Sequence, residues 1–202
     1  MRRVFGLLPL AFAAIHGQLG AADQNIDFRN FTYPFPTQTF IPVPDKLAWM
    51  SLNVKTTVTL VNGRYDFDQG DPSGGPSLIL HRVLYGYLTS AKQLDAVVVL
   101  GYHTGGTAYW DYVYAFSLES NSPKLVGWFR AGSRADSGLY QLEVTNRSLT
   151  VELLDPGRRL ADCCSEGFVR TTYDFKNGYF VQRGAQEFGN VESPGPKRPN
   201  PK

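Results

Sequence analysis

The segment LDAVVVLGYHTGGTAYWDYVYAF, residues 94–116, decides the fold of this 202-residue chain. In its first half, apolar residues fill both sets of alternating positions, one set ending at Tyr102 and the other at His103. In its second half, aromatic residues recur at every second position between Trp110 and Phe116. Alternation with period two, carried by β-branched and aromatic residues, is typical of β-strands. Because a Gly-Gly pair separates the halves, the segment predicts two antiparallel strands joined by a tight turn.

The same alternation recurs along most of the chain, and turn-forming residues such as Asn62-Gly63, Asn146-Arg147 and Asn177-Gly178 separate the runs. The sequence therefore predicts a mainly β fold, a single domain with an antiparallel, hairpin-rich sheet of about eight or nine strands. An α+β fold is the alternative, with Lys46–Asn53 as the best place for a short helix. The expected strands are 56–61, 78–87, 95–103, 108–118, 123–130, 138–145, 148–154, 168–175 and 179–183.

The first 22 residues have the order of a secretory signal. Two arginines precede a mostly apolar run, Val4–Ile15, and small residues follow up to Ala22, where we expect cleavage. The run is shorter than the roughly 20 residues that span a bilayer. No cysteine follows it, so we expect a soluble mature protein without a membrane anchor, located in the periplasm or secreted, by a route left open.

The rest of the chain divides into three parts. Residues 23–54 are rich in proline and are expected to run extended over the surface, apart from the candidate short helix. Residues 55–184 form the predicted β-rich domain. Residues 185–202, which end in SPGPKRPNPK, are predicted to be a disordered tail, because that stretch has no apolar group to bury.

Charge limits the classes of partner. The chain contains 20 Lys+Arg and 18 Asp+Glu, and loss of Arg2 and Arg3 with the signal leaves 18 of each. A mature protein without net charge, and with interspersed charges, has no footprint for nucleic acid or an anionic membrane. A protein of the envelope or the extracellular space is the expected kind of partner.

The only two cysteines, Cys163 and Cys164, are adjacent. A tetrahedral metal site needs about four ligands, and only His81 and His103 remain elsewhere in the mature chain, so we predict no metal and no cofactor. A redox motif would have a spacer between the thiols. In an oxidising compartment each cysteine can pair only with the other, which favours a structural disulfide. Two buried, reduced thiols are the alternative.

Hydrolysis is the enzymatic hypothesis. His103 precedes the glycine turn, Asp111 lies on the next strand, and Ser133 or Ser137 would complete a Ser-His-Asp set. However, the chain has no Gly-x-Ser-x-Gly elbow and no second signature of a hydrolase. A catalytic residue is therefore not assigned.

A binding face is the non-enzymatic hypothesis, and we favour it. Exposed aromatic residues beside arginines commonly anchor recognition surfaces. Tyr109 should point away from the predicted core and toward His103, and two arginines follow Trp128. The sequence thus predicts a non-catalytic interaction or structural module, with a candidate face made of His103, Tyr109, Trp128, Arg130 and Arg134.

Three fragments together carry a resemblance to a known family: IDFRNFTYPFP (26–36), the opening segment, and DCCSEGFVRTTYDFKNGYFV (162–181). In this order they resemble uncharacterised exported bacterial proteins and, more distantly, the mycobacterial LppP and LprE lipoproteins. Those lipoproteins have Cys-Cys-Pro-Ser where this chain has Ser165-Glu166 after the pair, and they carry an anchoring cysteine near the start. The resemblance implies export and a shared fold, and it implies no particular reaction.

Overall fold

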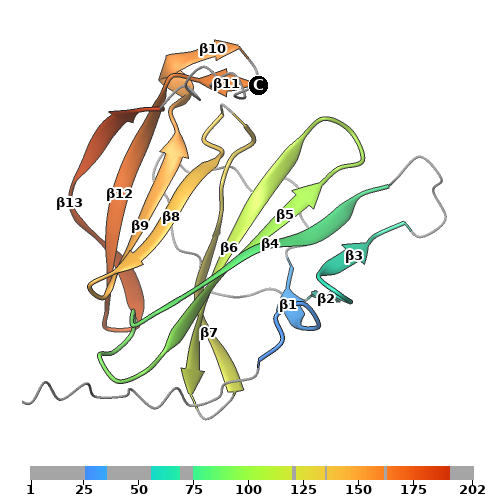
Figure 1. Cartoon of the computed structure of the whole chain (residues 1–202), viewed down its shortest axis with the longest axis vertical. Helices are drawn as coiled ribbons and strands as arrows, with labels where there is room; N and C mark the ends of the chain where they lie inside the picture. The colour runs from blue at the N-terminus through green and yellow to red at the C-terminus, as the bar shows by residue number, and fades with distance from the viewer. Residues whose placement is uncertain are drawn as a thin grey trace, which may run out of the picture.

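The computed structural model describes residues 26–35, 56–68, 75–119, 122–134, 136–161 and 163–191. Two antiparallel sheets dominate this region and face each other as layers (Figure 1). The predicted single-domain, mainly β fold is confirmed. The helix predicted at 46–53 lies outside the described residues, and none of the described ranges contains an α-helix. Accordingly, no helix in these ranges has the length and apolar character needed to cross a membrane.

The larger sheet has five strands, and its order follows the chain as β3-β4-β5-β6-β7. Each strand pairs antiparallel with the next, so this sheet is a meander of hairpins. The opening segment supplies its two central strands. The five strands are β3 (Arg64–Asp66), β4 (Ser77–Gly86), β5 (Asp95–His103), β6 (Tyr109–Glu119) and β7 (Ser122–Arg130).

The smaller sheet has four strands in the order β13-β12-β9-β8, again antiparallel throughout. A 3-10 turn, Pro156–Arg158, and a small hairpin of β10 (Arg159–Ala161) and β11 (Cys164–Ser165) are inserted between β9 and β12. This hairpin lies at the top of the view in Figure 1. The four strands are β8 (Leu139–Thr145), β9 (Ser148–Leu154), β12 (Gly167–Lys176) and β13 (Tyr179–Asn190).

The predicted turns have the backbone conformation that their residues favour. Asn62-Gly63, Asn146-Arg147 and Asn177-Gly178 each have two consecutive positive φ angles, between 51° and 88°. Gly105, between β5 and β6, has a φ of 83°. Two consecutive positive φ angles are typical of the type I′ turn, whose twist matches that of the strands it joins.

Strand β5 is buried on both faces, which explains why its sequence is apolar at almost every position. One set of alternating residues, which includes Val97 and Val99, packs against the four-stranded sheet. This packing forms the inter-sheet layer, which also contains Val113, Phe129, Leu142, Leu149, Val151 and Tyr173.

The opposite face of the five-stranded sheet is covered by the N-terminal part of the chain. Strands β1 (Thr32–Pro34) and β2 (Thr57–Thr59) pair with each other and cross this face (Figure 1). Tyr114 donates a hydrogen bond to the Pro34 carbonyl (2.9 Å), which fastens the cover to β6. This second layer, here called the aromatic layer, contains Phe28, Tyr33, Phe35, Tyr112, Tyr114, Phe116 and Trp128.

One sequence-based boundary is wrong. Strand β13 continues to Asn190, so residues 185–190 do not belong to a disordered tail. The strand was predicted too short because Gly184, with a φ of 68°, interrupts the alternation. Pairing is out of register between Arg183, opposite Thr172, and Glu187, opposite Arg170, and then resumes. Such a bulge inserts extra residues into one strand without ending it.

Other differences concern short elements. Strands β1, β3, β10 and β11 have three residues or fewer, too few for alternation to be recognised. The strand predicted at 56–61 covers only 57–59. The signal at 1–22 and the last eleven residues, 192–202, lie outside the described chain.

Candidate functional site

A β-bulge in β4 places two consecutive polar residues on the inter-sheet face. Leu80 is opposite Leu100 and Arg82 is opposite Val99, so His81 is the extra residue without a partner in β5. Arg82 shares the face of Val99, which lies in the inter-sheet layer. His81 reaches Asp111 on the same side. Bulges re-aim side chains in this way and are common beside functional sites.

Gly101 makes room for the His81 ring. It lies in β5 directly opposite Asp111 of β6. A Cβ atom at Gly101 would overlap the imidazole of His81. Because Gly101 has no side chain, the His81 ring can lie over β5, and its Nδ1 is 3.2 Å from Oδ1 of Asp111. Asp111 is only 5% exposed, so this contact connects a half-exposed ring to a buried carboxylate.

Ring contacts hold His103 in place. His103 is paired with Tyr109 across β5 and β6, and their rings stack with centroids 5.7 Å apart. The His81 ring meets His103 edge-on at 5.9 Å. Among the described residues neither His103 nor Tyr109 has a side-chain hydrogen bond, although both rings are fixed.

Burial and neighbouring charges both act on these rings. Burial lowers the pKa of His103 from its usual 6.5, as do the nearby His81 and Arg64, while Asp111 opposes the change. Burial raises the pKa of Tyr109, with a further contribution from Asp111, and Arg134 opposes it. At neutral pH His103 is therefore held in its neutral form.

These side chains line an open pocket of about 370 Å³ at the junction of the two sheets. We call it the histidine pocket, and its lining consists of His81, Arg82, Val99, His103, Tyr109, Asp111 and Leu139. Leu139 comes from β8, so both sheets contribute. A second hollow of similar volume follows the edge of β4, shares His81 and Arg82 with the first, and adds Arg29 and Arg64.

The structure divides the predicted binding face. Trp128 and Arg130 are opposite Tyr114 and Tyr112, on the aromatic layer and thus on the other side of the sheet from His103. They are only 2% and 8% exposed, and the Arg130 guanidinium lies 5.8 Å from the Trp110 ring. The prediction of one exposed face containing these two residues is wrong, because β7 alternation directs them inward.

Of the predicted face, His103 and Tyr109 remain together. Arg134 lies in the turn after β7, near enough for its charge to affect Tyr109. Sequence reasoning did not place His81 and Arg82 at the site. The available signal was Gly101, since an isolated glycine within a strand often marks a bulge or a close approach.

The hydrolase geometry is not assembled. Asp111 contacts His81 instead of His103. Ser133 belongs to a tight turn, where its carbonyl accepts a hydrogen bond from the Asp136 amide, and the Ser137 carbonyl accepts one from Gly132. Neither serine has a side-chain hydrogen bond to a histidine within the described chain. The hydrolase hypothesis thus lacks the contact between nucleophile and base that it requires.

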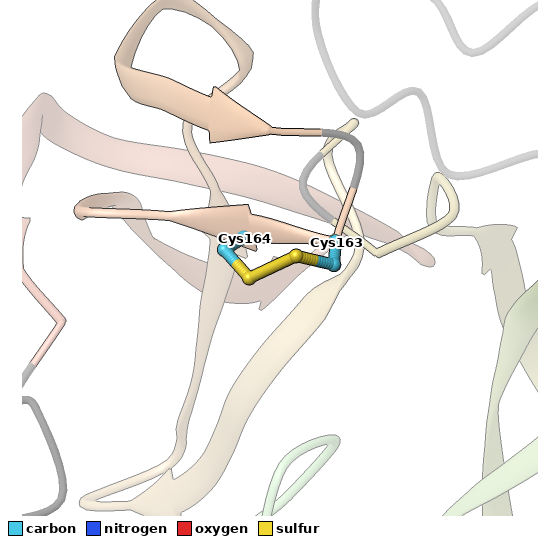
Figure 2. Close-up of a disulfide and its surroundings, with 2 residues drawn as sticks. All are labelled: Cys163 and Cys164. Atoms are coloured by element: carbon cyan, nitrogen blue, oxygen red, sulfur yellow. A yellow bond between two sulfur atoms is a disulfide. The ribbon is translucent and has the colours of Figure 1, made fainter.

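Cys163 and Cys164 are joined by a disulfide at the start of β11 (Figure 2). Both residues are exposed, so the alternative of two buried thiols is wrong. The next residue, Ser165, is buried and its hydroxyl bonds to the carbonyls of Asp155 and Gly167 (2.8 and 2.9 Å). The disulfide lies on the surface of a loop whose interior is organised by Ser165.

In the described ranges, no three His, Cys, Asp or Glu residues are grouped as metal ligands. The chain matches no protein-family model, no curated protein and no solved structure.

Proposed function

We propose that this chain is an exported, β-rich binding module and that the histidine pocket is its ligand site. One observation carries the proposal: His103 is fixed between the rings of His81 and Tyr109, but neither it nor Tyr109 uses its polar atoms within the described chain. These polar atoms are not buried, so they remain accessible to a ligand that enters the pocket. A preformed hollow with unused, oriented polar groups is the usual form of a binding site.

Binding is better supported than hydrolysis. The carboxylate of Asp111 orients His81, and no serine in the described part of the chain completes the set. The pocket instead provides side chains held in place by packing, because the His81 ring packs against Gly101 and the His103 ring stacks on Tyr109. Rigid side chains lose little entropy when a ligand binds.

The export part of the proposal rests on the sequence. The charged, apolar and small-residue order of residues 1–22 and the resemblance to exported bacterial proteins both support it. An exposed disulfide also agrees with an oxidising compartment. Intact-mass measurement on protein from the envelope or medium of its own host tests it, and a species that still begins at Met1 contradicts it.

Site-specific photocrosslinking tests the binding part. A benzoylphenylalanine placed at Leu139, on the rim of the histidine pocket, should capture a discrete envelope molecule. The same residue placed at Lys124 should not, because Lys124 is opposite Ser117, at the far end of the sheet from His103. Equal labelling at the two positions, or none at Leu139, overturns the proposal.

A further inference from the structure

The histidine pocket and the hollow beside it are rich in cations. Taken together, their linings include three arginines, Arg29, Arg64 and Arg82, and two imidazoles. The one carboxylate in either lining is Asp111, and it contacts His81. Arg64 is paired with Asp66 at 2.6 Å, and Arg29 contacts the Asn62 carbonyl. Arg82 has no ion pair with any residue of the described chain.

The hydrogen-bonding groups of Arg82, His103 and Tyr109 can all donate, although a neutral imidazole and the Tyr109 hydroxyl can also accept. An arginine guanidinium can only donate hydrogen bonds, and a protonated imidazole donates from both nitrogens. The Tyr109 hydroxyl adds another donor. Arg82, His103 and Tyr109 therefore present donors toward one hollow. The natural complement is an acceptor-only group with several oxygens, such as a carboxylate or a phosphate.

We infer that the histidine pocket binds the oxyanion group, a carboxylate or a phosphate, of its ligand, held by Arg82, His103 and the Tyr109 hydroxyl. This inference rests on the proposed function and names the chemical class of ligand. His81, oriented by Asp111, forms the wall against which the anion lies. The basic hollow along β4 would receive the remainder of the ligand.

Binding of an anion at this site is linked to protonation of His103. The titratable and charged groups that face His103 are His81 and Arg82 from β4, Arg64 from β3, and Tyr109 and Asp111 from β6, while Leu139 of β8 is apolar. Burial and the nearby positive charges hold the pKa of His103 below 6.5 in the free protein. A bound anion favours the imidazolium and raises that pKa. Anion affinity therefore increases as the pH falls.

Titration calorimetry of the full chain with sodium sulfate tests the inference, because sulfate keeps its charge between pH 5.5 and 7.5. Sodium chloride holds the ionic strength constant. We expect binding about tenfold tighter at pH 5.5 than at pH 7.5, the change that one pKa unit of linkage produces. Arg82→Ala should weaken it about tenfold or more, and His103→Gln should remove most of the pH dependence. Lys124→Ala removes one cation elsewhere and should change neither the sulfate affinity nor its pH dependence.

Two further measurements keep the outcomes separate. Sodium acetate in place of sulfate identifies a carboxylate site if it competes better, and a phosphate-type site if it competes worse. The imidazole proton resonances of His103, assigned with His103→Gln, should show a higher pKa in saturating sulfate.

Sulfate binding equal to that of chloride, or equal losses in Arg82→Ala and Lys124→Ala, overturns the inference. If the inference fails in this way but crosslinking at Leu139 continues, the pocket still binds a ligand, and that ligand belongs to another chemical class. Loss of both specific sulfate binding and crosslinking at Leu139 overturns the anion inference and the proposed binding function together.

Discussion

At the scale of single residues, the absence of a side chain at Gly101 determines the site. The residues on either side of it in β5 are buried and apolar, and any side chain at this position would point into the inter-sheet layer. Glycine instead leaves the space in which the His81 ring lies. The bulge in β4 turns the His81 side chain toward Asp111, and Gly101 leaves the space that the His81 ring occupies.

Gly101→Ala should separate His81 from Asp111, because the new methyl group overlaps the ring. We expect the free energy of unfolding to fall by about 1–3 kcal/mol, the usual cost of overpacking. Urea denaturation measures this loss. The double variant His81→Ala/Gly101→Ala should recover most of it, because the ring that caused the overlap is gone. Additive losses in this double-mutant cycle contradict the account.

The disulfide and its neighbour Ser165 should differ in importance. Replacing Cys163 and Cys164 together by Ser should lower the free energy of unfolding by only about 1–2 kcal/mol, because so short a loop hardly restricts the unfolded chain. Ser165→Ala should cost at least as much, since its buried hydroxyl bonds to Asp155 and Gly167. Without reductant, the denatured protein should contain no titratable thiol. Two titratable thiols would rule out the disulfide.

At the scale of elements, turns and paired strands account for the regularity of the two sheets. The β5–β6, β8–β9 and β12–β13 turns contain residues with positive φ, and neighbouring strands pair antiparallel throughout both sheets. The conformation of one residue in these turns is unfavourable for its side chain. Arg147, in the β8–β9 turn, has a φ of 64° and a side chain that disfavours this conformation.

Arg147→Gly should therefore stabilise the protein by about 0.5–1 kcal/mol, because glycine adopts this conformation without strain. Gly178→Ala is the matched control in the β12–β13 turn. Its φ is 88° and no atom lies within 4 Å of the added methyl group, so it tests backbone strain alone. It should destabilise by about 1 kcal/mol in thermal unfolding. The same sign for both variants would contradict this account.

Asp174 links three strands of the four-stranded sheet and predicts an acid transition. Arg183 first, then Ser148 and Lys176, lower the pKa of this carboxyl from 3.8 to about 2. The folded pKa lies below the unfolded value, so the stabilisation is complete only well above pH 3.8 and is lost as the pH falls through about 2. Asp174→Asn should remove about 1 kcal/mol at pH 6, given the exposed partners, and only a small part of that at pH 2. Equal losses at both pH values would contradict the electrostatic origin.

At the scale of the whole molecule, the five-stranded sheet is the middle of three layers. The four-stranded sheet covers one face and the N-terminal residues cover the other. The cover includes Phe28, Tyr33 and Phe35, all of which are buried. Stability therefore depends on a segment that comes soon after the expected cleavage site.

A chain without residues 1–35 should lose this cover and expose the aromatic layer. We expect strong binding of a hydrophobic dye and a cooperative unfolding transition that is much weakened or absent, because several aromatic side chains become solvated. A chain without residues 1–22, which is the expected mature protein, serves as the control and should unfold cooperatively and bind little dye. Comparable dye binding by the two chains would show that the N-terminal segment does not protect the sheet.

The sequence alone determined the fold class, most of the longer strands and several hairpin turns. Alternation and turn residues are local signals, and β5 and β9 were predicted with their observed bounds, Asp95–His103 and Ser148–Leu154. Local signals also predicted that Tyr109 meets His103. They failed at Gly184, where a bulge interrupts the alternation of β13.

Only the tertiary structure decided the site. His81 and Asp111 are thirty residues apart, and a one-residue bulge in β4 and a missing side chain in β5 bring them together. Trp128 and Arg130 were assigned to the wrong side of the sheet, because hydrophobic pattern and chemistry do not reveal which face a neighbouring layer covers. Strand pairing and layer packing depend on contacts between distant residues, and these contacts decide which polar side chains share a pocket.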